Sequence, residues 1–126
     1  MSWQGYVDTN LVGTKKISKA AILGLKGGVW ATSPGFTISP AEQTAIIAGF
    51  DDPSGLQAGG IRADSQKYLF LQADPRKIYG KQGDGGIVCV KTNQAVLVGV
   101  YTSPTVPGEA NTVVEGLADY LIGVGF

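Results

Sequence analysis

The sequence has no histidine and only one cysteine among its 126 residues. Without histidine, a Ser-His or Cys-His nucleophile pair cannot form, and the commonest general base near neutral pH is absent. One cysteine and scattered carboxylates give no cluster with the spacing of metal ligands. We therefore expect a protein that is not an enzyme and that needs neither a cofactor nor a metal.

Net charge is also lacking, because 10 Lys and Arg residues balance 10 Asp and Glu residues. Nucleic acid is therefore not an expected partner, and an electrostatic partner must meet a local patch. Long apolar runs and a signal peptide are missing too, and Cys89 sits in an apolar run that is typical of a buried core thiol. We expect a soluble, cytosolic protein whose residues 1–126 form a single domain with its own core.

What the sequence does contain is a strongly patterned segment over residues 107–126. Pro107 suits the first position of a helix, and Gly123 is placed to end it. The apolar residues that recur at helical spacing are Val113, Leu117, Tyr120, Leu121 and Val124. A helix of this kind cannot bury its apolar stripe alone, so we expect it to dock on another part of the chain.

The opening residues offer a partner for that helix. Ser2 is a good N-cap, and Trp3, Val7 and Leu11 follow at a spacing of four, which predicts a short helix ending near residues 13–14. Trp3 and Tyr6 lie in its first two turns. Two interpretations stay open here: these aromatic residues staple the helix to the core, or they form part of a binding surface.

The middle of the chain predicts a sheet with helices on its faces. Residues 20–24 and 29–32 are typical of two strands joined by a glycine turn, and residues 39–42 form a capping box that opens a helix ending before a loop at 51–55. From Gly60 onward we expect strands at 68–71, 77–79, 87–90 and 95–101, with a turn at 83–86 that lacks the spacing of a phosphate-binding loop. Short connections imply antiparallel pairing, so the fold class is α+β.

Two surfaces remain as candidates for binding. Aromatic residues from both ends of the chain and from an early strand suit a polyproline II ligand: Trp3, Tyr6, Trp30, Tyr120 and Phe126. Basic residues gather in the strand-rich second half: Arg62, Lys67, Arg76, Lys77, Lys81 and Lys91. On the sequence alone, a solvated sheet edge is the simpler explanation of the basic set.

Several stretches resemble the profilin family, specifically its amoeboid and fungal forms. They are Ser2-Trp-Gln-Gly-Tyr-Val-Asp8, Val29-Trp-Ala-Thr-Ser33, Ile78-Tyr-Gly-Lys81, Gly86-Ile-Val-Cys-Val-Lys-Thr92 and Leu117-Ala-Asp-Tyr-Leu-Ile-Gly123. The resemblance covers the whole chain. It implies a central antiparallel β-sheet, with the N- and C-terminal helices packed together on one face and further short helices on the other.

The resemblance also implies a cytoplasmic regulator of actin polymerisation that sequesters or delivers actin monomers at the cytoskeleton. It assigns polyproline binding, to partners such as formins, to the aromatic set named above. It assigns actin binding to Lys67, Arg76, Lys81, Lys91, Thr92, Gly108, Asn111, Thr112 and Gly116. Phosphoinositide binding, the weakest implication for a neutral chain, would use Arg76, Lys77, Lys81 and Lys91.

This sequence departs from the family pattern at two positions. The family often ends in Tyr, whereas Phe126 keeps the stacking face without the hydroxyl. Related proteins often carry Arg after the strand that ends at Leu71, whereas this chain has Gln72. We expect the first change to remove one ligand hydrogen bond and the second to weaken attraction to actin or to lipid headgroups.

Two other classes of function stay open on the sequence. One is a sheet-based sensor with a small-ligand cavity between helices and sheet. The other is a protein that binds lipid headgroups only. The tryptophan fluorescence of either should not respond to oligoproline, whereas a proline-binding adaptor should respond.

Overall fold

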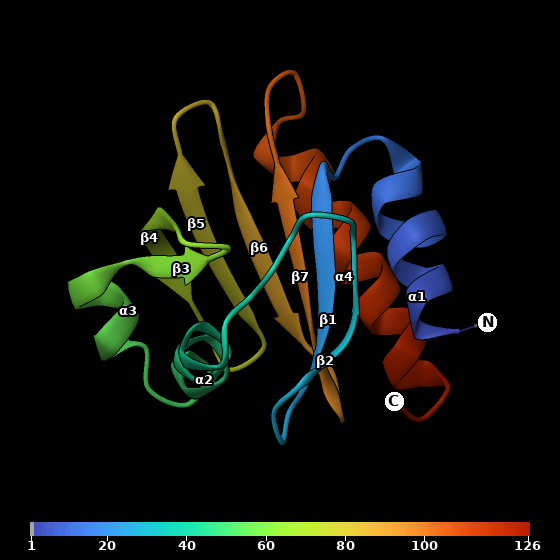
Figure 1. The fold of residues 1–126 in the computed structure, drawn as a ribbon, viewed down its shortest axis with the longest axis horizontal. Helices are drawn as coiled ribbons and strands as arrows, with labels where there is room; N and C mark the ends of the chain where they lie inside the picture. Colours follow the sequence, from blue (N-terminus) through green and yellow to red (C-terminus); the bar gives the residue numbers. More distant parts are fainter. Residues whose placement is uncertain (1) are drawn as a thin grey trace.

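Seven antiparallel strands form the sheet at the centre of the computed structural model, which describes residues 2–126 (Figure 1). The strands lie in the order β2-β1-β7-β6-β5-β4-β3. In chain order the elements are α1 (Trp3–Gly5), η1 (Tyr6–Leu11), η2 (Val12–Thr14), β1 (Lys19–Gly24), β2 (Val29–Thr32), α2 (Pro40–Gly49), α3 (Ser54–Gly59), β3 (Ile61–Ala63), β4 (Gln66–Ala73), β5 (Lys77–Gln82), β6 (Gly85–Lys91), β7 (Ala95–Tyr101) and α4 (Pro107–Gly123).

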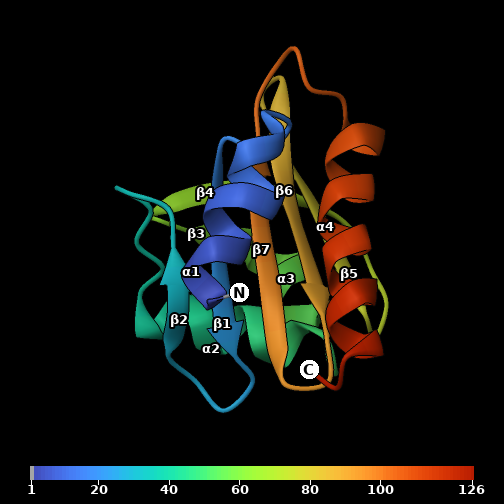
Figure 2. The same ribbon diagram turned by 90° about the vertical axis from the view of Figure 1, so that its right-hand side faces the viewer.

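The helices cover both faces of this sheet. The N-terminal helical turns and α4 lie side by side on one face, and α2 and α3 lie on the other (Figures 1 and 2). Each face has its own cluster of buried side chains: Leu11, Leu97 and Leu121 belong to the first, and Ile46 and Ile78 belong to the second. The expected α+β arrangement, with paired terminal helices on one face, is confirmed.

Strand β7 lies inside the sheet, which explains why its sequence is one apolar run. All seven of its residues are buried, because β1 and β6 flank it and helices cover both of its faces. Gly99 is needed there, since a Cβ at this position would lie 2.8 Å from Val114 Cγ2 of α4. The missing side chain lets α4 approach the sheet closely.

The capping box at the start of α2 is confirmed. Glu42 N donates to Ser39 Oγ at 3.2 Å, and Ser39 N donates to Glu42 Oε1 at 2.9 Å. The second oxygen of the same carboxylate accepts from Ser65 N at 2.9 Å. The Glu42 side chain therefore caps the start of the helix and also attaches it to the turn between β3 and β4.

Two expectations for the middle of the chain are wrong. The loop expected at residues 51–55 runs directly into α3, and β3 pairs with β4 ahead of the first strand expected in this half. Both elements are short and contribute few buried side chains of their own, chiefly Leu56 and Ile61. Elements of this size carry no apolar period that the sequence alone could reveal.

The docking face of α4 also differs from the expected stripe. Val113 is only half-buried, whereas Tyr120 and Val124 are 54% and 49% exposed. The residues that face the sheet are Ala110, Val114, Leu117, Ala118 and Leu121. Small alanines allow the close approach, so the buried face is rotated away from the largest side chains.

Within residues 2–126, α4 and the other helices all fall short of the length and apolar character needed to cross a bilayer.

Candidate functional site

Aromatic side chains from both ends of the chain meet beside β2. The α1 helix begins correctly because Gly5 N donates to Ser2 Oγ at 3.0 Å, which places Trp3 next to the sheet. The Trp3 ring centroid lies 4.8 Å from that of Trp30 and 5.3 Å from that of Phe126. Tyr6 lies 5.8 Å from Trp3 and 6.3 Å from Tyr120. These five residues form one contiguous surface, which we call the aromatic groove.

The C-terminal residue Phe126 is anchored to the sheet beside the groove, close to the start of the chain (Figure 2). The Phe126 carbonyl accepts hydrogen bonds from Gln94 N at 2.7 Å and from Thr92 Oγ1 at 2.8 Å, both in the turn between β6 and β7. Phe126 N donates to Leu121 O at 2.8 Å. Thr92 was expected on the actin-binding surface, but it is buried and its hydroxyl is committed to Phe126. Contrary to that expectation, its side chain is not free to contact a partner.

The groove is open to solvent on one side. Trp30, Tyr120 and Phe126 are each at least 39% exposed, whereas Trp3 and Tyr6 are half-buried against the core beneath the terminal helices. Trp3 and Tyr6 therefore staple the helix to the core, as one interpretation expected, and their role in a binding surface stays a prediction that their open faces allow. Desolvation, followed by the neighbouring Tyr120 hydroxyl, raises the pKa of Tyr6.

The indole nitrogens of the groove are available as donors. Within the described range 2–126, no protein acceptor takes a hydrogen bond from the indole N–H of Trp3 or Trp30. A polyproline II helix presents solvated carbonyl oxygens and a preformed shape. Aromatic faces with free donors at their edges match that ligand.

Gly24 controls where Trp30 lies. A Cβ on Gly24 would come within 2.6 Å of Trp30 Nε1 and 2.8 Å of Cε2, so the indole rests directly on this part of the β1 backbone. The sequence placed Trp30 in the aromatic set, but it gave no sign that a glycine on the paired strand supports its ring. Gly24 is a positioning residue for the groove.

Two hollows extend the groove beyond its aromatic residues. The first, about 500 Å³, lies between the terminal helices and is lined by Tyr6, Asn10, Thr14, Val113, Gly116, Leu117 and Tyr120. The second, about 450 Å³, lies beyond Trp30 and is lined by Gly24, Leu25, Lys26, Gly27, Trp30, Asn93 and Gln94. A ligand longer than the aromatic groove has space at either end.

The basic residues predicted as a second site fall into two groups. Arg76, Lys77 and Lys91 meet where β5 begins and β6 ends, since Lys91 N donates to Arg76 O at 2.8 Å and Arg76 Nε donates to Lys91 O at 3.2 Å. Lys81 lies at the other end of β5, opposite Leu69 of β4. Lys67, also on β4, pairs with Arg62 of β3. The four residues expected to bind phosphoinositides are therefore divided, with Lys81 apart from the other three.

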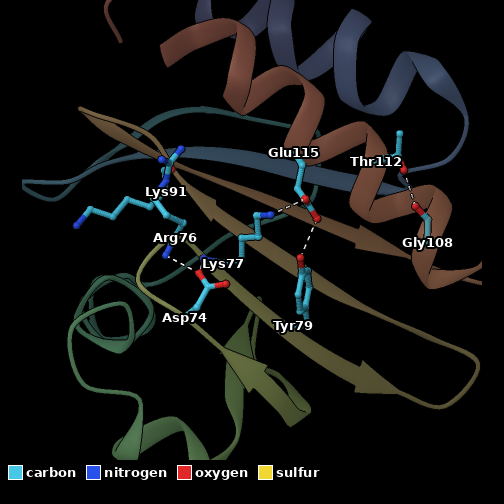
Figure 3. Close-up of polar contacts among 8 residues, drawn as sticks. All are labelled: Asp74, Arg76, Lys77, Tyr79, Lys91, Gly108, Thr112 and Glu115. Carbon is cyan, nitrogen blue, oxygen red and sulfur yellow. Dashed lines mark hydrogen bonds and ion pairs between the residues drawn. The ribbon is translucent and has the colours of Figure 1, made fainter. Parts of the chain in front are cut away.

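The Lys77 side chain already forms an ion pair with a carboxylate of α4 (Figure 3). Its Nζ lies 2.9 Å from Glu115 Oε1, and the Tyr79 hydroxyl donates to Glu115 Oε2 at 2.7 Å. The hydrogen bond from Lys77 to Glu115 raises the pKa of Lys77. Burial, followed by the separate hydrogen bond from Tyr79 to Glu115, raises the pKa of Tyr79. Glu115 of α4 thus has two structural partners on the sheet.

The start of α4 lies beside this sheet edge. Gly108, Thr112 and Gly116 are exposed, although the Thr112 hydroxyl donates back to Gly108 O at 2.8 Å. Asn111 borders a hollow of about 220 Å³ whose other lining residues are Leu71, Gln72, Tyr79, Ile87, Tyr101 and Pro107. Apart from Thr92, the residues expected to bind actin have surfaces open to a partner, although Lys67 and Lys81 lie at a distance from Arg76 and Lys91 along the strands.

This face also carries exposed apolar residues that were not predicted from the sequence. Leu69, Leu71 and Val106 are 64%, 51% and 53% exposed, which is unusual for residues of this kind. The alternation of side chains along a strand could have predicted this exposure. Tyr68 and Phe70 turn toward the core, which leaves Leu69 outside. The same alternation places Leu71 outside, at the bulge between Phe70 and Gln72.

Cys89 has the expected structural role. It is fully buried on β6, and burial raises the pKa of its thiol to about 12. A thiol in this state is a poor nucleophile. In the described part of the chain, no three His, Cys, Asp or Glu side chains gather in a way that could hold a metal ion.

Comparisons with known proteins agree on one family. A family model described as Profilin matches residues 1–126. Profilin-1B of Acanthamoeba castellanii is 54% identical over 126 residues, and profilin of Schizosaccharomyces pombe is 50% identical over 127, with 100% of both chains covered in each pair. The solved structure of Acanthamoeba castellanii profilin IB has a TM-score of 0.96 at 54% identity, over 99% of this chain and 100% of that one. Mouse profilin IIa, solved in complex with a double repeat from the FH1 domain of mDia1, shares the fold, with a TM-score of 0.83 at 22% identity over 100% of both chains.

Proposed function

The chain belongs to the profilin family of non-enzymatic, actin-binding proteins, and we propose that it joins actin monomers to proline-rich proteins through two separate surfaces. In this proposal it sequesters or delivers monomeric actin in the cytoplasm and so regulates polymerisation at the cytoskeleton. Family membership favours this adaptor over a small-ligand sensor or a protein that binds lipid headgroups only.

The aromatic groove is the observation that carries the proline-binding half of the proposal. Its rings are already in contact with one another, so a proline-rich ligand orders few side chains on binding. The ligand is itself preordered as a polyproline II helix. The complex of mouse profilin IIa with an FH1 repeat supports formins as a partner class.

The actin-binding half rests on the face formed by β4 to β6 and the start of α4. Exposed Leu69 and Leu71 provide an apolar centre, and the basic residues Arg76 and Lys81 lie on either side of it along the sheet. This combination of an apolar core and a polar rim is what protein interfaces use. We assign Lys67, Lys91, Gly108, Asn111, Thr112 and Gly116 to the rim of the same surface.

Phosphoinositide binding is a third and weaker part of the proposal. Arg76 and Lys91 form no ion pair within residues 2–126, so their charges are available to an anionic headgroup. Each cation near an anionic membrane surface contributes about 1 kcal/mol. Two unpaired cations beside Lys77, at one end of β5 and β6, support modest and salt-sensitive binding.

Titration of the tryptophan fluorescence with oligoproline tests the first half directly. Trp3 and Trp30 both line the groove, so ligand contact should change their emission. A Gly-Ser peptide of equal length is the control and should have no effect. A fluorescence signal that does not respond to oligoproline would contradict the proposed site, whatever the outcome with actin.

A further inference from the structure

We call the surface of β5 and β6 that carries Arg76, Lys77, Lys81 and Lys91 the basic face. Glu115 of α4 lies at the centre of a small network on this face (Figure 3). One of its oxygens is 2.9 Å from Lys77 Nζ, and the other accepts the Tyr79 hydroxyl at 2.7 Å. Both carboxylate oxygens are therefore committed to the sheet. The side chains of Lys77 and Glu115 are 38% and 26% exposed, so the pair lies at the surface and can be reached by a ligand.

The neighbouring cations are held in a different way. Asp74 Oδ1 accepts the backbone N–H groups of Arg76 and Lys77, at 2.7 and 2.8 Å, which leaves their side chains unpaired by that carboxylate. Within residues 2–126 the ion pairs are Lys77 with Glu115 and Lys16 with Glu109. At this end of the sheet, Lys77 alone is neutralised by a carboxylate from outside its own strand.

We infer that Glu115 is a specificity-determining residue that withholds Lys77 from polyphosphorylated headgroups and so limits the affinity of this face for phosphoinositide membranes. This inference rests on the proposed phosphoinositide binding. A bound phosphate would have to compete with Glu115 for the ammonium group while also being repelled by the carboxylate. Arg76 and Lys91 would be left to attract the membrane against an adjacent negative charge.

Stability alone is a poor explanation for this ion pair. Pairs exposed to solvent usually contribute little to folding, and the Tyr79 hydroxyl needs only a neutral acceptor. Glutamine has nearly the same shape as glutamate and keeps an oxygen for Tyr79. The charge of Glu115 therefore has more influence on what binds at this face than on whether the chain folds.

The test compares two charge-removing substitutions on α4. Glu115→Gln releases Lys77, and Glu109→Gln releases Lys16 at the start of the helix, with the same change in net charge. Binding is measured by co-sedimentation with phosphatidylcholine vesicles that contain a minor fraction of phosphatidylinositol bisphosphate. We expect about five-fold tighter binding for Glu115→Gln, the gain from one additional free cation, and little change for Glu109→Gln.

A double variant shows whether the gain passes through Lys77. Glu115→Gln combined with Lys77→Gln removes the whole ion pair and should bind the vesicles like the parent. An equal gain in both single variants, no gain in Glu115→Gln, or a gain that persists in the double variant would each overturn the inference. If the headgroup itself is recognised, soluble inositol trisphosphate should bind the variants in the same order of affinity. Equal affinity for all variants would also count against the inference.

Failure of this inference can be separated from failure of the proposed function. Oligoproline and actin binding are measured on the same variants, and unchanged oligoproline binding shows that the fold is intact. If neither the parent nor Glu115→Gln binds the vesicles while both bind actin and oligoproline, the phosphoinositide inference is wrong and the adaptor proposal stands.

Discussion

The aromatic groove and the basic face are built on different physical principles. The groove consists of rings in mutual contact, contributed by both ends of the chain and fixed by the hydrogen bonds of Phe126. The basic face consists of long side chains on neighbouring strands, with one cation already neutralised by Glu115. A preassembled apolar site gains affinity by burying area, whereas an exposed charged site acts on encounter rate and responds to salt.

Because of this difference, substitutions at the two surfaces should have effects of different size and kind. Loss of one aromatic anchor removes a large contact and should show in the dissociation rate. Loss of one charge should show in the association rate, and less so as salt rises.

The largest effect is expected from Trp3→Ala or Trp30→Ala. Either change should cost about 2 kcal/mol or more of oligoproline binding, because each ring is a packed anchor of the groove. Actin affinity should remain near that of the parent. Titration calorimetry with both ligands checks this, and equal losses for both in a protein that melts normally would show that the surfaces are not separate.

A smaller loss is expected from Gly24→Ala, which changes no residue that touches the ligand through a side chain. The added Cβ would lie 2.6 Å from Trp30 Nε1, so the indole must move away. We expect about ten-fold weaker oligoproline binding, equal to about 1.4 kcal/mol. Gly59→Ala is the control, since a Cβ there meets nothing within 4 Å. Parent-like binding by Gly24→Ala would show that the position of Trp30 is not critical.

Charge reversal at Arg76 and Lys81 should slow association with actin. These residues are five positions apart on or beside β5, about 16 Å at the usual strand rise, so their effects should add. We expect a fall of several-fold in the association rate for each change to Glu at low salt, with oligoproline binding unchanged. Stopped-flow mixing with actin monomers measures this, and an unaltered rate at low salt would remove both residues from the site.

The smallest effect is expected from Gln72→Arg. Gln72 is exposed and borders the hollow beside Leu71 and Asn111, so an added cation faces the proposed actin partner. Exposed charge contacts contribute less than about 1 kcal/mol, which gives at most a few-fold tighter binding. The gain should fade as the Debye length falls to about 8 Å near physiological salt. Equal affinity for parent and variant at low salt would mean that Gln72 points away from the partner.

Much of this contrast could be predicted from the sequence, for local reasons. Helical spacing placed Trp3 and Tyr6 in the first turns of an N-terminal helix, and the capping box at Ser39 identified the start of α2. Signals of this kind depend on residues within one or two turns of each other. They do not report how far a docked helix rotates, so Tyr120 was placed in a buried stripe although it is exposed.

What could not be predicted depends on contacts between distant segments. Thr92 and Phe126 are 34 residues apart, and only the folded sheet brings the hydroxyl to the carbonyl. The pairing of Glu115 with Lys77 is also set by where α4 crosses the sheet. The support of Trp30 by Gly24 likewise follows from the pairing of β1 with β2.

The central claim is that one chain carries two independent surfaces. Actin-monomer affinity measured with and without saturating oligoproline tests it most directly, because both ligands then compete for any shared residue. Independence predicts that the two actin affinities agree within about two-fold, the usual limit of additivity for separate sites. A large loss of actin affinity when the groove is filled would contradict the claim and would mean that the two surfaces overlap.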